Sequence, residues 1–146
     1  MNVVIINGPN LNLLGVREKS IYGDQSFEEY LKELRQNFPS INISYFQSNV
    51  EGEIINCLHE NGFDCDFIII NAGGYTHTSV AIADAISSIE ANVIEVHISN
   101  IYSRDDYRRK SITSEAVDGI ICGFGEKGYT LAIDAIKNLI YKNSND

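Results

Sequence analysis

Side chains that can do chemistry gather in three short segments of the sequence. Residues 7–10 read Asn-Gly-Pro-Asn, residues 71–78 read Asn-Ala-Gly-Gly-Tyr-Thr-His-Thr, and residues 95–100 read Glu-Val-His-Ile-Ser-Asn. Imidazole titrates near neutral pH, so His97 is a candidate general acid or base. Glu95 lies two residues earlier, on the same face of an extended strand, where its carboxylate can orient the ring or favour its charged form.

Each of these residues alone also has a structural interpretation. An asparagine can tie a turn, a histidine can satisfy a buried carbonyl, and Glu95 can be a capping or solvated carboxylate. All three segments, however, lie at the ends of apolar runs that the pattern below predicts to be parallel strands. Carboxyl ends of parallel strands meet at one edge of a sheet, so the clustering favours a binding site there.

One basic stretch stands out in an acidic chain, whose 11 Lys and Arg against 20 Asp and Glu give a net charge of −9. It contains Arg104, Arg108, Arg109 and Lys110. On a short helix Arg104 and Arg108 share a face and offer donors to an anionic or hydroxylated ligand, although a solvated patch is the alternative. The acidic balance argues against nucleic acid and against a membrane surface. We therefore expect a small-molecule substrate.

Short apolar runs alternate with amphipathic stretches along the whole chain. Runs rich in β-branched residues are typical of strands covered on both faces, and strands alternating with helices predict right-handed crossovers. The fold class predicted is α/β, a flavodoxin-like doubly wound five-stranded parallel sheet with the order 2-1-3-4-5. The expected strands are 3–6, 41–46, 67–70, 93–96 and 120–122, and the expected helices lie around 27–38, 54–58, 80–86 and 131–139.

The chain of 146 residues contains no linker or repeat, so we expect a single catalytic domain over residues 1–146. The first strand-to-helix connection runs from Asn7 to Gln25, far longer than usual, and predicts an active-site lid loop at about 16–25. The first long helix has a capping box, in which Ser26 precedes Glu29 by three residues. Gly62 is expected as the C′ glycine of the second.

The sequence argues against several classes of site. Residues 123–128 match the G-x-G-x-x-G fingerprint, but only one helix follows them, so we interpret them as a tight strand-to-helix turn rather than a dinucleotide site. The cysteines, Cys57, Cys65 and Cys122, form no C-x-x-C pair and are expected to be reduced in the cytoplasm. Residues 1–8 resemble neither a signal peptide nor a membrane span. No metal site and no cofactor are expected.

The three segments together resemble a known family. Residues 7–15 (Asn-Gly-Pro-Asn-Leu-Asn-Leu-Leu-Gly), followed by Arg17-Glu18 and Tyr22-Gly23, are similar to the opening of the type II 3-dehydroquinate dehydratases. Residues 71–79 and 95–101 are similar to two further motifs of that family, in the same order and spacing. The resemblance extends from the first strand to Gly128. It implies a carbon–oxygen hydro-lyase of the shikimate and quinate pathways.

The resemblance further implies that 3-dehydroquinate loses water by anti elimination through an enolate to give 3-dehydroshikimate, without metal, cofactor or Schiff base. In this scheme Tyr22 removes the proton from C2, and Arg17 lowers the pKa of Tyr22. Asn10 helps to stabilise the enolate through a bound water. His97, held by Glu95, protonates the departing C1 hydroxyl.

The resemblance also implies how the substrate is held and how subunits assemble. Asn71 and Ser99, with the Ile98 backbone, bind the carboxylate and a nearby hydroxyl. His77 and Arg108 bind ring hydroxyls. Asp84 approaches the site from a neighbouring subunit, as in the family's dodecamers built from trimers. The substrate-binding set is Asn71, Gly73, Gly74, His77, Asp84, Ile98, Ser99 and Arg108.

A different class of protein stays open at this point. A flavodoxin-like sheet also serves non-catalytic modules that bind FMN or a partner protein. Flavin absorbance of the purified protein indicates the module, whereas turnover of 3-dehydroquinate indicates the enzyme.

Overall fold

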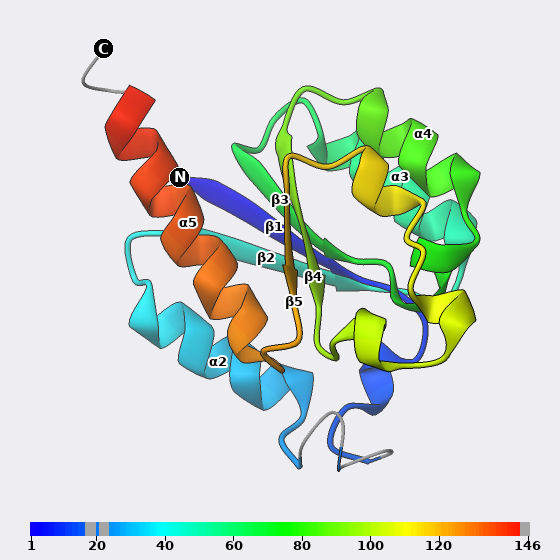
Figure 1. The fold of residues 1–146 in the computed structure, drawn as a ribbon. Coiled ribbons are helices and arrows are strands. Elements are labelled where there is room, and N and C mark those ends of the chain that lie inside the picture. The colour runs from blue at the N-terminus through cyan, green and yellow to red at the C-terminus, as the bar shows by residue number, and fades with distance from the viewer. Residues whose placement is uncertain (17–19, 21–23, 144–146) are drawn as a thin grey trace.

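One parallel sheet organises the chain in the computed structural model, which describes residues 1–16, 20 and 24–143 (Figure 1). Its strand order is β2-β1-β3-β4-β5, so the predicted fold class and order are confirmed. Every neighbouring pair is parallel. The strands are β1 (Asn2–Asn7), β2 (Asn42–Gln47), β3 (Phe67–Asn71), β4 (Asn92–His97) and β5 (Gly119–Cys122).

Helices cover both faces of this sheet (Figure 1). The helices α2 (Phe27–Asn37) and α5 (Lys127–Asn143) pack on one face, and α3 (Glu51–Asn61) and α4 (Val80–Ser87) pack on the other. In the described part of the chain, no helix combines the length and apolar character that crossing a bilayer needs.

Alternation along β1 divides the core into two layers. Val3 and Ile5 face the α2–α5 layer, whereas Val4 and Ile6 face the α3–α4 layer. All four side chains are buried, because helices cover both faces of the sheet. The sequence of this strand is therefore a continuous apolar run and not an alternating one. The sequence pattern therefore located the strands correctly.

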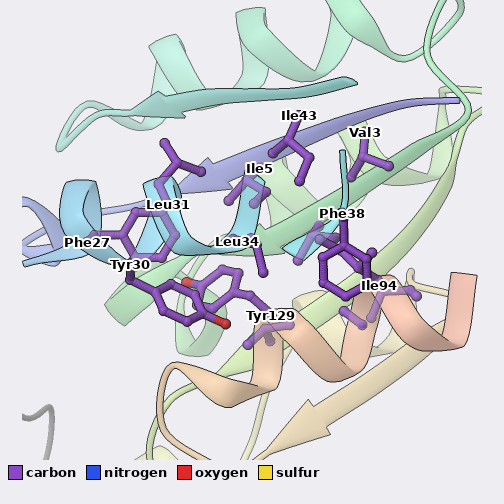
Figure 2. Packing of buried hydrophobic residues seen from close by; sticks show 14 of the residues in the cluster. Val3, Ile5, Phe27, Tyr30, Leu31, Leu34, Phe38, Ile43, Ile94 and Tyr129 are labelled. Atoms are coloured by element: carbon purple, nitrogen blue, oxygen red, sulfur yellow. The ribbon is translucent and has the colours of Figure 1, made fainter. Parts of the chain in front are cut away.

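Aromatic rings join α2 to α5 over the sheet (Figure 2). The rings of Phe27 and Tyr129 meet edge to face with their centroids 4.9 Å apart, a favourable arrangement. The hydroxyl of Tyr30 lies 2.6 Å from Oγ1 of Thr130. These contacts fix the first turn of α5, where Tyr129 is fully buried.

The caps of α2 and α3 test two sequence predictions. The predicted capping box is present: Ser26 Oγ accepts from the Glu29 backbone N–H, and the Glu29 carboxylate accepts from the Ser26 N–H. The prediction for Gly62 is wrong, since it is the C-cap with φ −67° and not a left-handed C′ residue. Its glycine is needed for space instead, because a Cβ there would lie 2.4 Å from Cγ2 of Ile89.

The loops at the carboxyl edge of the sheet contain short 3₁₀ helices. Single 3₁₀ turns reverse the chain tightly and bring loop side chains back over the strand ends. At this edge they are η1 (Leu11–Leu13), η2 (Gly73–His77), η3 (Ile101–Ser103) and η4 (Asp106–Arg108), whereas η5 (Thr113–Glu115) packs against α4.

Candidate active site

A cavity of about 170 Å³ opens at the carboxyl ends of the strands. The loops that follow β1, β3 and β4 surround it, and η4 closes one side. This is the edge at which open parallel sheets bind ligands, so the predicted location agrees with the geometry. The lining residues are Pro9, Asn10, Leu11, Asn71, Gly73, Gly74, His77, His97, Ile98, Ser99, Ile101, Arg104 and Arg108.

Two glycines allow the loops after β1 and β3 to touch. A Cβ on Gly8 would lie 2.5 Å from the backbone oxygen of Ala72, so no larger residue fits there. Gly73 has φ +60°, a left-handed conformation that favours glycine, and packs against Pro9. Asn10 is also left-handed, with φ 68°, and its backbone N–H donates to Oδ1 of Asn49 over 3.0 Å. This close approach forms the floor of the cavity.

A buried hydrogen-bond network supports Asn71 from below. Its Nδ2 donates to the Tyr129 hydroxyl over 3.2 Å, and its Oδ1 accepts from the Gly73 backbone N–H over 3.1 Å. The Tyr129 hydroxyl in turn donates to Oδ1 of Asn7 over 2.7 Å. Burial raises the pKa of Tyr129, which therefore stays protonated and keeps donating. The network joins β1, β3 and α5.

Glu95 and His97 form the titratable pair that the sequence predicted. Both side chains come from β4 and are buried, with exposed fractions of 0% and 5%. Nε2 of His97 lies 3.3 Å from Oε2 of Glu95. This contact has the distance of an ion pair but not the alignment of a hydrogen bond, and Nε2 has no other partner among the described residues. Because His97 also lines the cavity, its ring separates the buried carboxylate from a ligand.

Four hydroxyls, here called the hydroxyl cluster, surround the Glu95 carboxylate: Thr76, Ser111, Thr113 and Ser114. Thr76 Oγ1 donates to Oε1 over 2.7 Å. Thr113 donates to the same oxygen and Ser114 donates to Oε2. Burial alone would raise the pKa of Glu95, but the His97 imidazole and the hydroxyls of Ser114 and Thr113 outweigh it and lower the value to about 2. Glu95 is therefore an anion at every physiological pH.

The tautomer of His77 follows from its hydrogen bond. Nδ1 lies 2.6 Å from the carbonyl oxygen of Lys110, and a carbonyl can only accept, so Nδ1 carries the proton. Burial lowers the pKa of His77, which keeps the ring neutral at pH 7. In the neutral ring Nε2 is an acceptor, and it can accept a hydrogen bond from a ligand hydroxyl.

Arg104 and Arg108 bring positive charge to the cavity. The expectation that they share the face of one helix is wrong, because Arg104 follows η3 and Arg108 ends η4. The Arg104 guanidinium donates to Oγ of Ser99 over 3.3 Å. That of Arg108 lies 5.1 Å from the centre of the Tyr107 ring. Arg109 pairs with an exposed carboxylate and belongs to the surface.

Most of the predicted site residues lie together around the cavity, although Asp84 does not. Asp84 is exposed on α4 and is not a lining residue of its own chain's cavity. Glu95 lies behind His97. Arg17 and Tyr22, and most of the predicted lid at 16–25, lie outside the described residues. The predicted residues that line the cavity are Asn10, Asn71, Gly73, Gly74, His77, His97, Ile98, Ser99 and Arg108.

Sequence reasoning missed the residues that support the site from behind. Tyr129 lies on α5, ahead of residues 131–139 where the sequence predicted the last helix. The run Ser111-Ile-Thr-Ser114 follows the basic stretch, and a cluster of small hydroxyl residues beside Arg and Lys is a signal that could have been noted. Within the described ranges, no three His, Cys, Asp or Glu side chains gather as metal ligands.

The glycine-rich turn after β5 is a tight strand-to-helix connection, as predicted. Gly123 and Gly125 have φ of +93° and +61°. Their backbone N–H groups donate to the carbonyls of His97 and Ile98, over 3.1 and 2.9 Å. A Cβ on Gly128 would lie 2.9 Å from Cγ1 of Val96. The turn thus anchors the end of β4, which carries His97.

The sheet and the cavity define an α/β enzyme that binds a small polar ligand at the carboxyl ends of its strands. The chain belongs to the type II dehydroquinases: the model of the family described as Dehydroquinase class II matches residues 1–137. The 3-dehydroquinate dehydratase of Clostridium acetobutylicum is 51% identical over 144 residues, covering 97% of this chain and 100% of that protein. The protein of the same name from Clostridium beijerinckii is 53% identical over 141 residues, covering 94% and 96%.

Solved structures agree with the sequence relatives. The type II dehydroquinase from Butyrivibrio crossotus superposes with a TM-score of 0.90 at 45% identity, covering 94% of this chain and 97% of that chain. A 3-dehydroquinate dehydratase-like protein from Bifidobacterium longum is more distant, with a TM-score of 0.69 at 26% identity over 96% and 98% of the two chains.

Proposed function

We propose that this chain dehydrates 3-dehydroquinate to 3-dehydroshikimate by anti elimination through an enolate, within the shikimate or quinate pathway. The observation that carries the proposal is the Glu95–His97 pair at the end of β4, facing a cavity with two arginines. The relatives, which are named 3-dehydroquinate dehydratase, support the same reaction. They do not favour the alternative of an FMN- or partner-binding module.

His97 is the general acid in this proposal. A hydroxyl leaves C1 readily only when a proton reaches it, and an imidazole at the cavity wall can deliver that proton. The ionised Glu95 behind the ring orients the imidazole towards the cavity. Glu95 itself does not touch the substrate. It acts through His97.

Substrate binding uses the polar groups of the cavity wall. Arg108, with Arg104 beside it, supplies the local positive charge that draws an anionic substrate into a chain of net charge −9. Nε2 of His77 accepts a hydrogen bond from a ring hydroxyl. Asn71 and Ser99, with the Ile98 backbone, hold the carboxylate and the nearby hydroxyl, and the loop at Gly73 and Gly74 leaves room for the ring.

Tyr22 is the proposed base and Arg17 its activator, on the resemblance described above. Asn10, at the cavity edge, stabilises the enolate through a water. In this proposal residues 1–146 form a single catalytic domain, and its lid over residues 16–25 carries both the base and its activator. We expect Tyr22→Phe to lose most of kcat while still binding substrate. An active Tyr22→Phe variant would show that another group removes the proton.

The mechanism needs no imine. Among the described residues, no lysine lines the cavity. Borohydride added together with 3-dehydroquinate should therefore leave activity intact. Substrate-dependent inactivation, with added mass on a lysine, contradicts the enolate mechanism.

Assembly and location complete the proposal. Asp84, exposed on α4, serves the site of a neighbouring subunit in a homo-oligomer, a dodecamer built from trimers. Cytoplasmic location is supported by the three cysteines, which are all free. Sedimentation of the active protein tests the assembly, because a fully active monomer excludes a shared site.

One assay decides the function. Purified protein is mixed with 3-dehydroquinate, and the ultraviolet absorbance of the conjugated enone product is followed. We expect turnover, and we expect His97→Asn to lower kcat at least a hundredfold. His59→Gln is the matched control, since His59 is exposed on α3 and does not line the cavity. A protein that absorbs as a flavoprotein and shows no turnover refutes the proposal.

A further inference from the structure

The hydroxyl cluster determines how the Glu95 carboxylate is held behind His97. This inference rests on the proposed function of His97. A carboxylate has two oxygens, each able to accept about two hydrogen bonds. The hydroxyls of Thr76 and Thr113 both reach Oε1 of Glu95. The hydroxyl of Ser114 reaches Oε2. Both oxygens of the carboxylate are therefore held by hydroxyls, and Oε2 is held by fewer close ones than Oε1.

Oε2 is also the oxygen that His97 approaches, since Nε2 lies 3.3 Å from it, at ion-pair distance. The Ser111 hydroxyl lies 3.4 Å from Oε2 but only 2.6 Å from the Thr76 oxygen. Ser111 therefore supports Thr76 more closely than it contacts Glu95.

We propose that Thr76, Thr113 and Ser114 are positioning residues of the proton donor: their hydroxyls hold both oxygens of Glu95, so that the carboxylate is fixed with Oε2 beside His97. With these donors in place a proton on Glu95 would displace a hydrogen bond, so Glu95 does not take the proton that His97 must deliver. The low pKa of Glu95, about 2, agrees with this arrangement.

The arrangement joins separate parts of the chain. Thr76 comes from η2, which also carries His77, while Thr113 and Ser114 both lie on η5. Thr76 and Thr113 are both fully buried, so water does not replace them. His97 and His77 are the titratable groups that act on Glu95 from β4 and η2. The loop over residues 111–115 is therefore part of the catalytic apparatus, although in the described structure none of its residues lines the cavity.

The test measures the carboxylate directly. The ¹³C resonance of the Glu95 carboxyl is followed against pH in the wild type, in Thr113→Val and in Thr113→Ser. Valine keeps the branched shape and removes only the hydroxyl, whereas serine keeps the hydroxyl. We expect the titration midpoint of Glu95 to rise by about 1 to 2 pH units in Thr113→Val and to stay near that of the wild type in Thr113→Ser.

Kinetics give the second readout. Thr113→Val should lower kcat about tenfold, because the carboxylate and the ring lose their fixed geometry, with KM within twofold of the wild type. Thr113→Ser should restore kcat. Thr78→Val is the control, since Thr78 is exposed on the same loop as Thr76. Should Thr113→Val not fold, Ser114→Ala removes the donor to the other oxygen.

The outcomes separate the two proposals. An unchanged Glu95 titration in Thr113→Val and Ser114→Ala overturns the positioning role, and so does a Thr113→Ser variant that behaves like Thr113→Val. If the wild type does not turn over 3-dehydroquinate, the proposed function fails, while the carboxyl titration still decides whether the hydroxyls fix Glu95.

Discussion

Replacing Tyr129 by phenylalanine removes one buried oxygen and leaves the aromatic ring in place. The hydroxyl donates to Asn7 and accepts from Asn71, so the change leaves two polar atoms without their partner. A buried polar atom that loses its partner costs about 1–3 kcal/mol. Asn71 borders the cavity, where water can reach it, and we therefore expect the free energy of unfolding to fall by about 2 to 3 kcal/mol in total.

The same change should weaken substrate binding. Asn71 loses its support from below while keeping its bond to the Gly73 backbone, so its amide is less well oriented. We expect KM to rise several-fold and kcat to stay within about threefold. Urea unfolding followed by circular dichroism gives the stability, and steady-state turnover gives the two kinetic constants.

Tyr102→Phe is the matched control, because Tyr102 is 64% exposed. Its free energy of unfolding should stay within about 0.5 kcal/mol of the wild type. If Tyr129→Phe is as stable as the control, the buried network does not contribute as argued. If kcat falls and KM does not change, Tyr129 acts on the chemical step and not on binding.

Four further variants test other features. Burial, together with the charge of Glu33, raises the pKa of Glu126 to about 7, so the folded protein loses stability as the pH rises from 4.5 to 7. Once screening by solvent is allowed for, the Glu126→Gln variant should be more stable than the wild type by roughly 1 kcal/mol at pH 8. At pH 4 the two should be equally stable, and urea unfolding measures both. Gly8→Ala should cost about 1–3 kcal/mol and most of the activity, because the Ala72 backbone leaves no room, whereas Gly52→Ala, with open space, should stabilise α3 by about 0.5–1 kcal/mol. Ser26→Ala should lower the melting temperature through the loss of about 1 kcal/mol of capping.

The fold was predictable because local signals and the global arrangement agree. Val3 to Ile6 form an unbroken apolar run, and the structure covers that strand on both faces. The Ser26 capping box marks the start of α2 without any knowledge of the tertiary structure. Gly62 was misinterpreted because its cause is a tertiary contact with Ile89, and no local pattern records such a contact.

The residues of the site also fall into two groups, those predictable from the sequence and those that only the fold brings together. His97 and Glu95 could be paired from the sequence, since a separation of two residues on a strand places them on one face. Thr113 could not, because it lies 18 residues beyond Glu95 and reaches it only through the fold. The two arginines were found but wrongly placed on one helix, because irregular loops with 3₁₀ turns have no period that a sequence reveals.

The hydrogen bond between Tyr129 and Asn7 joins residues 122 positions apart, and this separation has a consequence for synthesis. A nascent chain emerges from the ribosome from its N-terminus at about 5–20 residues per second. The first strand is therefore available long before the helix that supports its end. Asn7 and Asn71 stay without their shared partner until residue 129 has left the exit tunnel. The binding loop consequently gains its support only once residue 129 has emerged, and a polypeptide released before that point lacks it.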